Sequence, residues 1–169
     1  MLAHEVTSMN PCSISVNNRQ HQVDPARGQR LVDLLRDELG LRGTHEGCDT
    51  AQCGACTVLA DGCAVKSCNV LAAQMAGKQI QTIESVAPGD DALHVIQRAF
   101  SEHHALQCGY CTPGFVMRTL AMLEESVPAE PMAVRRALSG NLCRCTGYEG
   151  IVHAVVSSLR ALRPPTEMP

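Results

Sequence analysis

The chain has 169 residues, a net charge of −3, 45% hydrophobic residues and 18% charged residues, the composition of an ordinary soluble globular protein. It has no basic run, which argues against nucleic acid as a partner, and no stretch approaches the ~18 apolar residues of a membrane span. Residues 1–11 lack the apolar segment of a signal peptide, so we expect a cytoplasmic protein.

The first half of the chain begins with a predicted hairpin and a predicted helix. Residues 13–16 and 19–23 are joined by Asn17-Asn18, and asparagine tolerates the positive φ of a tight hairpin turn. The helix is expected to end at Gly40, and it rests on leucines at helical spacing, namely Leu31, Leu34, Leu35 and Leu39.

A second hairpin is predicted around Asp61-Gly62, with Thr57-Val58-Leu59 before the turn and Ala64-Val65 after it. Ile80 and Ile83 are expected to lie in a last strand. Two hairpins, a helix and a further strand indicate a small mixed α/β domain.

The run Ala87-Pro88-Gly89-Asp90 breaks this pattern, and we place a domain boundary there. Leu93, Ile96 and Phe100 are expected on one face of the first helix after it, while Thr112 suits an N-cap. The helices are predicted over residues 91–104, 113–125, 131–138 and 150–162, which together make a compact bundle.

Ten cysteines point to metal or redox chemistry if the compartment is reducing. Cys48, Cys53 and Cys56 have the C-x4-C-x2-C spacing of plant-type [2Fe–2S] ferredoxins, which requires a fourth cysteine further on. Cys63 and Cys68 are the candidates, and Cys68 is favoured because Cys63 belongs to the hairpin turn. A zinc site is the alternative, although zinc prefers paired C-x2-C knuckles.

The second cysteine group consists of a C-x2-C pair, Cys108 and Cys111, and a C-x-C pair, Cys143 and Cys145. Alone, this spacing also fits zinc. Each pair precedes a predicted helix, however, and helix N-termini stabilise anions such as a four-thiolate [2Fe–2S] cluster. Both tyrosines of the chain, Tyr110 and Tyr148, lie in these loops, where they either shield a cluster or fill the core.

With both groups in view, the chain from Ser13 to Leu162 resembles the small iron–sulfur subunit of the molybdenum hydroxylases, the xanthine oxidase family. The resemblance rests on the spacing Cys48-x4-Cys53-x2-Cys56-x11-Cys68, then Cys108-x2-Cys111-x31-Cys143-x-Cys145. It also rests on the strings EGC at 46–48, QCGYCTPG at 107–114 and GNLCRCTG at 140–147.

The resemblance implies an α+β fold with a β-grasp, plant-type [2Fe–2S] ferredoxin domain followed by a four-helix [2Fe–2S] domain. We assign residues 10–86 to the first domain, 87–163 to the second and 164–169 to a flexible tail. The implied ligands of the distal cluster are Cys48, Cys53, Cys56 and Cys68, and those of the cluster proximal to molybdenum are Cys108, Cys111, Cys143 and Cys145. Gln107 matches a family residue that hydrogen-bonds the pterin cofactor.

The function implied by the resemblance is electron transfer from a molybdenum cofactor through two [2Fe–2S] clusters to FAD. The chain would be one subunit of an oxidoreductase, and it offers no catalytic base or nucleophile of its own. The implied partners are a large subunit with molybdopterin cytosine dinucleotide and a medium FAD subunit, in a dimer of heterotrimers. An N-heteroaromatic substrate is expected. The alternatives are the small subunit of an aerobic carbon monoxide dehydrogenase, a free-standing ferredoxin and a zinc-binding interaction protein.

Four residues that bind metals in other proteins lie outside this pattern. Cys12 and Cys63 are extra to the eight cysteines of the family, and we interpret both as free thiols. The adjacent pair His103-His104 is interpreted as solvated histidines at a helix end rather than as Rieske-type ligands.

Overall fold

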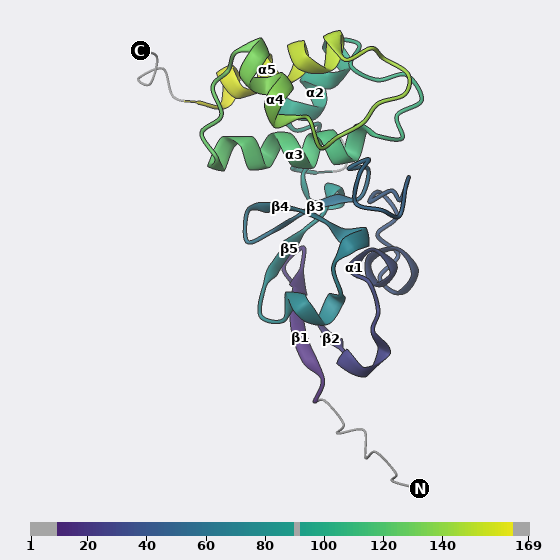
Figure 1. The fold of residues 1–169 in the computed structure, drawn as a ribbon. Helices are drawn as coiled ribbons and strands as arrows, with labels where there is room; N and C mark the ends of the chain where they lie inside the picture. The colour runs from purple at the N-terminus through teal and green to yellow at the C-terminus, as the bar shows by residue number, and fades with distance from the viewer. Residues whose placement is uncertain (1–9, 90–91, 164–169) are drawn as a thin grey trace, which may run out of the picture.

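Figure 1 shows the fold in a computed structural model, which describes residues 10–89 and 92–163. We call these two ranges the N-terminal half and the C-terminal half. All strands lie in the N-terminal half and the longer helices in the C-terminal half, which confirms the predicted α+β class. In chain order the strands and α-helices are β1 (Cys12–Val16), β2 (Arg19–Val23), α1 (Leu31–Asp33), β3 (Thr57–Ala60), β4 (Cys63–Lys66), β5 (Gln79–Gln81), α2 (Val95–Glu102), α3 (Thr112–Glu124), α4 (Pro131–Ala137) and α5 (Glu149–Leu162).

The five strands form one mixed sheet in the order β2-β1-β5-β3-β4. β1 pairs antiparallel with β2 and parallel with β5, while β3 pairs antiparallel with β4 and with β5. Both predicted hairpins are confirmed. Asn17 and Asn18 have φ of 48° and 65°, and Asp61 and Gly62 have φ of 48° and 81°, the positive values that both central residues of a tight hairpin turn need.

The predicted leucine helix is confirmed, although it changes type along its length. After α1 it continues as one π-helical segment, Leu34–Glu38, in which the Leu39 N–H donates to the Leu34 carbonyl. Leu31, Leu34 and Leu35 are buried against sheet residues such as Ile14 and Ile80, and this packing forms the core of the N-terminal half. Gly40, with φ of 70°, ends the helix as expected.

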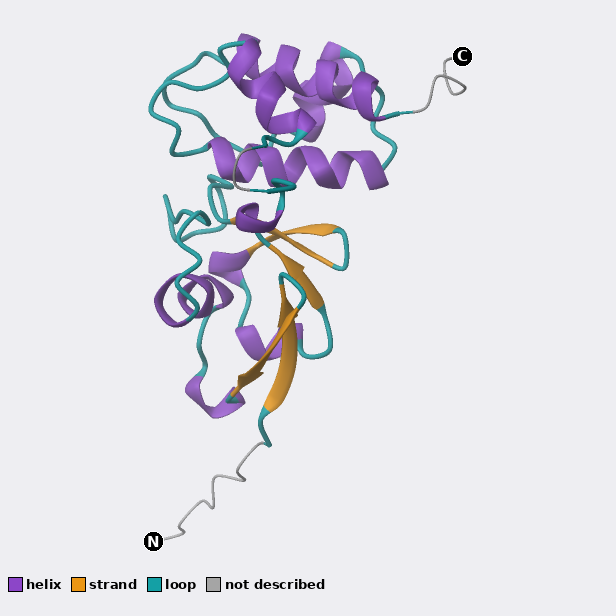
Figure 2. Ribbon diagram, turned by 180° about the vertical axis from the view of Figure 1, so that it is seen from behind, coloured by secondary structure: helices purple, strands orange, loops and turns teal. Residues whose placement is uncertain are grey.

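In the C-terminal half, α3 lies between the sheet and the other helices, as both ribbon views show (Figures 1 and 2). Its partners in the core include Ile96 and Phe100 from α2, Val134 from α4 and Ile151 from α5. Leu59 of β3 belongs to the same buried cluster. The hydrophobic core of the helices therefore includes a residue of the sheet. None of the helices in the described ranges is long and apolar enough to cross a membrane.

The predicted start of the first helix after the break is wrong. It was expected at residue 91, but α2 begins at Val95, so Leu93 precedes it and is 57% exposed instead of buried. The cause is a capping arrangement centred on His94. The Ile96 N–H donates to the His94 ring, and the Gln97 side chain accepts from the His94 N–H, which fixes the N-terminus there.

Two smaller predictions also need correction. Ile83 lies in a short 3-10 segment after β5 rather than in the strand, because buried Thr82 bonds to the Asn17 side chain at 2.8 and 2.9 Å and turns the chain. The N-cap of α3 is Cys111 rather than Thr112, and Thr112 takes the first helical position.

Candidate iron–sulfur sites

The first cysteine group gathers beside α1. Cys48, Cys53 and Cys56 lie in the loop before β3, and Cys68 lies in a single 3-10 turn that follows β4. Cys56 and Cys68 are buried together in one small apolar cluster with Val32. Burial, with the neighbouring cysteines, raises the pKa of the Cys56 thiol to about 11. A bound cation would therefore be needed to keep the Cys56 sulfur ionised.

Cys48 has the opposite environment, because hydrogen-bond donors surround its sulfur. The N–H groups of Thr50 and Cys53 donate to Cys48 Sγ at 3.4 and 3.3 Å. The Thr50 side chain and these two amides lower the pKa of the Cys48 thiol to about 6. The amides point inward because Asp49 and Ala51 adopt φ of 55° and 57°, which makes the loop a concave anion-binding backbone.

Arg30, just before α1, fastens this loop to the body of the N-terminal half. Its guanidinium is 2.7 Å from both Asp33 and Glu46 and also pairs with Asp49, the residue after Cys48. These bonds and the three carboxylates raise the pKa of Arg30 above its already high ordinary value. The guanidinium therefore stays charged and holds the loop on both sides of Cys48, through Glu46 and Asp49.

The second cysteine group lies where α3 and α5 begin. Cys111 is the N-cap of α3, and Cys145 precedes the first residue of α5 by four positions. Cys108 Sγ and Cys145 Sγ are 3.6 Å apart. Burial and the adjacent Cys143 raise the pKa of Cys111 to about 12. Burial also disfavours ionisation of Cys143, but the hydroxyl and amide donors around it outweigh burial and lower its pKa.

In both groups the thiols approach one another in pairs. No three His, Cys, Asp or Glu side chains within residues 10–89 and 92–163 form a group that could hold one metal ion. The pairs are Cys48 with Cys53, Cys56 with Cys68, Cys108 with Cys145 and Cys111 with Cys143. Two thiolates on one tetrahedral metal, each about 2.3 Å from it, would be about 3.8 Å apart, which is close to the 3.6 Å between Cys108 Sγ and Cys145 Sγ. Two such pairs suit the two irons of a [2Fe–2S] cluster, so the donor sets fit this cofactor.

The two cysteine groups contact each other through the backbone. The Leu142 N–H, next to Cys143, donates to the Cys53 carbonyl at 2.8 Å. The buried Asn141 amide donates to the Gly54 carbonyl at 3.1 Å. On the other side of this carbonyl lies Gly114 of α3, where a Cβ would overlap the Gly54 oxygen. The first cysteine loop is thus held directly against the second.

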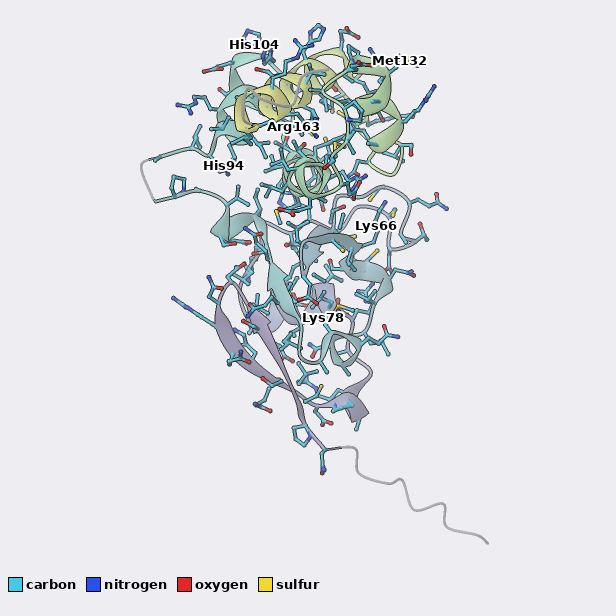
Figure 3. All side chains as sticks on the ribbon, turned by 90° about the vertical axis from the view of Figure 1, so that its left-hand side faces the viewer. Lys66, Lys78, His94, His104, Met132 and Arg163 are labelled. Carbon is cyan, nitrogen blue, oxygen red and sulfur yellow. The ribbon has the colours of Figure 1, made fainter. Side chains whose placement is uncertain are left out.

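Lys66 joins the same two segments from the end of β4. Its ammonium donates to the Gln52 carbonyl at 3.3 Å and to the Gly140 carbonyl. Figure 3 shows Lys66 at the level where the helical half meets the sheet. Lys66 and Arg30 were not predicted from the sequence, because Lys66 bonds to backbone carbonyls, which every residue carries, and Arg30 bonds to carboxylates that no motif marks. Asn141 was noted only as part of the string GNLCRCTG at 140–147, and nothing there indicated its bond to the Gly54 carbonyl.

The two tyrosines take different positions. Tyr148 is half-buried and packs edge-on against Phe115 in the helical core, with ring centroids 6.4 Å apart. Tyr110 is exposed, stacks on His45 at 4.5 Å and donates from its hydroxyl to the Glu46 carbonyl at 2.7 Å. Tyr110 is therefore a further link between the second cysteine group and the first loop.

The remaining predicted residues lie where their sequence context suggested. Gln107 is exposed next to Cys108, as a contact with a partner would require. Cys63 is exposed and is the first residue of β4, directly after the Asp61-Gly62 turn. Cys12 starts β1, with its sulfur 4.0 Å from the Ala73 carbonyl. His103 and His104 are exposed at the end of α2, as predicted. The structure thus gathers the eight predicted cysteines in two groups, and the assignment of each as a ligand remains a prediction.

Comparison with known proteins supports an iron–sulfur function. Residues 82–156 match the family model described as a [2Fe-2S] binding domain. The chain is 49% identical over 148 residues to the 6-hydroxypseudooxynicotine dehydrogenase complex subunit beta of Paenarthrobacter nicotinovorans, covering 86% of this chain and 91% of that protein. It is 45% identical over 155 residues to the xanthine dehydrogenase iron-sulfur-binding subunit of Escherichia coli O157:H7, covering 90% and 95%.

The fold is also similar to that of solved structures. A chain of quinoline 2-oxidoreductase from Pseudomonas putida 86 superposes with a TM-score of 0.82 at 40% identity, covering 92% of this chain and 96% of that one. Sequence, fold and paired thiols define an iron–sulfur electron-transfer protein of an oxidoreductase. The chain belongs to the family of small [2Fe–2S] subunits of the molybdenum hydroxylases, the xanthine oxidase family.

Proposed function

We propose that this chain is the electron-transfer subunit of a heterotrimeric molybdenum hydroxylase, which passes electrons from the molybdenum cofactor to FAD. The observation that carries the proposal is the pair of four-cysteine groups joined by the hydrogen bond from the Leu142 N–H to the Cys53 carbonyl at 2.8 Å. When bound, two [2Fe–2S] clusters would supply one-electron oxidation and reduction, which no side chain of the chain provides.

The proposal divides the chain into two domains, a β-grasp ferredoxin domain over residues 10–86 and a four-helix domain over residues 87–163. The mixed sheet with α1 packed on it supports the first assignment, and the helices α2 to α5 support the second. Cys48, Cys53, Cys56 and Cys68 would hold the distal cluster, and Cys108, Cys111, Cys143 and Cys145 the proximal one. The position of Cys68 beside Cys56, with Cys63 exposed, favours Cys68 as the fourth distal ligand.

The residues of the chain itself hold the two sites at a fixed separation. Cys53 and Cys143 are connected by covalent bonds and the single hydrogen bond between Leu142 and Cys53. Asn141 and Lys66 add two further links across the same boundary. Because loops held from several sides move little, the route between the two sites is fixed before any electron arrives.

The proposed partners are supported by the exposed residues of the second cysteine group, and the proposed substrate class by the names of the relatives. Cys108, Cys145 and Gln107 are exposed, which supports the proposal that Gln107 would hydrogen-bond a pterin, as molybdopterin cytosine dinucleotide, in a large subunit. A medium FAD subunit would contact the distal side, and two such trimers would pair in the cytoplasm. Relatives named for nicotine, caffeine and 6-hydroxypseudooxynicotine make an N-heteroaromatic compound the substrate class we propose.

The test is to purify the tagged chain from its native host and analyse its partners and cofactors. The proposal expects two co-purifying subunits, molybdenum, flavin, and about four irons with matching acid-labile sulfide per chain. A brown protein that elutes alone with the same iron would indicate a free-standing ferredoxin. A colourless protein with zinc would refute the iron–sulfur assignment. If the large subunit instead oxidised carbon monoxide, the N-heteroaromatic substrate class would be wrong.

A further inference from the structure

Among the cysteines of the second group, Cys143 has the sulfur with the most hydrogen-bond donors. The N–H groups of Cys145 and Thr146 each donate to Cys143 Sγ at 3.4 Å, and Thr146 Oγ1 lies 3.2 Å from the same sulfur. A thiolate that holds a metal has no proton and can only accept a hydrogen bond. The Thr146 hydroxyl would therefore be the donor once a cluster is bound.

The orientation of this hydroxyl is fixed by Tyr148. The Tyr148 N–H donates to Thr146 Oγ1 at 3.2 Å, which occupies one acceptor position of the oxygen and leaves its proton free for the sulfur. The Tyr148 phenol oxygen in turn accepts from the Cys143 N–H at 2.9 Å. Tyr148 makes both contacts with φ of 73°, a left-handed conformation that is uncommon for a bulky residue. Cys143, Thr146 and Tyr148 are thus joined in a ring of hydrogen bonds, in which the Thr146 hydroxyl contacts the Cys143 sulfur.

The other Cys-Thr pair of this group is built differently. Thr112 follows Cys111 as Thr146 follows Cys145, but Thr112 Oγ1 is buried without a hydrogen-bond partner in the described structure. The pKa of the Cys111 thiol is raised mainly by burial and by the neighbouring Cys143. The donors are thus concentrated on one side of the second group.

We propose that Thr146 sets the reduction potential of the proximal cluster by donating an oriented hydrogen bond to the Cys143 thiolate. Reduction adds one electron and one negative charge, so a donor to a ligand sulfur stabilises the reduced form more than the oxidised form. Loss of the hydroxyl therefore lowers the potential and makes the proximal cluster a poorer electron acceptor. This inference rests on the proposed function, because it requires a [2Fe–2S] cluster at this site.

The experiment compares Thr146→Val, Thr146→Ala and Thr146→Ser in the intact complex, with the midpoint potentials of both clusters measured by potentiometric EPR. Valine and alanine should shift the proximal potential to more negative values and alter its spectrum, while serine, which keeps the hydroxyl, should restore both. The distal signal in the same sample should not move. Thr119→Val is the matched control, because the buried Thr119 hydroxyl donates only to the Phe115 carbonyl of its own helix, at 2.8 Å.

Several outcomes would overturn the inference. An unchanged proximal potential in the valine or alanine variant would show that the hydroxyl does not act on the cluster. An equal shift in the serine variant, or in Thr119→Val, would indicate a packing effect. If Thr146→Val prevents cluster binding, the same test is made by comparing the proximal potentials of Thr146→Ala and Thr146→Ser. If the wild-type complex shows no second [2Fe–2S] signal, the proposed function itself fails, and this result is distinct from a cluster that is present but insensitive to Thr146.

Discussion

Gly114→Ala tests how closely the two halves of the chain approach. A Cβ at this position would overlap the Gly54 carbonyl oxygen and lie 3.1 Å from the Ala55 Cα, and both obstacles are backbone atoms. Overpacking of this kind costs up to about 3 kcal/mol, because backbone cannot rotate out of the way. Better helix propensity returns at most about 1 kcal/mol, so we expect a net loss of about 2 kcal/mol in the free energy of unfolding.

For a protein of this size, that loss corresponds to a Tm about 4–8 °C lower. Thermal unfolding of the cluster-loaded chain, followed by circular dichroism and by visible absorbance, measures the shift. Gly140→Ala is the control, because its Cβ would meet only the flexible end of Lys66 at 3.4 Å, and its stability should change by less than about 0.5 kcal/mol. A Gly114→Ala protein that is as stable as the wild type, with its circular dichroism and its visible absorbance intact, would refute the close approach of Gly114 to the Gly54 carbonyl.

The other predictions concern the cysteines and Lys66. Cys63→Ser should leave the iron content unchanged, whereas Cys68→Ser should lose the EPR signal of the distal cluster, because Cys63 is exposed while Cys68 is buried against Cys56. Loss of the distal signal in the Cys63 variant would show that Cys63 is the fourth ligand. Cys143→Ser should lose the proximal cluster and electron delivery to any acceptor, and full turnover without that cluster would contradict the relay. Lys66→Met should lower the free energy of unfolding by about 1 kcal/mol in urea titrations, since its bonds to two carbonyls are lost; an unchanged midpoint would argue against this link.

Local signals in the sequence predicted most of the fold. The turns at Asn17-Asn18 and Asp61-Gly62 were found because few residues tolerate positive φ at both central positions. The cysteine groups were found because their spacing is distinctive. Leu93 was misplaced because hydrophobic periodicity does not show where a helix begins, and the His94 cap determines that start.

The contacts between the halves could not be predicted in the same way. Asn141 and Gly54 are 87 residues apart, and Lys66 and Gly140 are 74 apart. Such pairs have no repeating pattern along the chain, and their partners are backbone carbonyls that every residue possesses. These contacts can be identified only in the folded structure, where α3 packs on the sheet.

The separation in sequence of Cys108 and Cys145 has a consequence for assembly. These sulfurs lie 3.6 Å apart but 37 residues apart along the chain, whereas Cys48, Cys53 and Cys56 come from one short loop. A cluster in the second group would act as a cross-link. In the loop-entropy model, closing a loop of that length raises the free energy of the unfolded chain by about 4 kcal/mol, because it removes conformational entropy. The helical half would then owe much of its stability to its cofactor, and maturation would favour filling the local first site before the second.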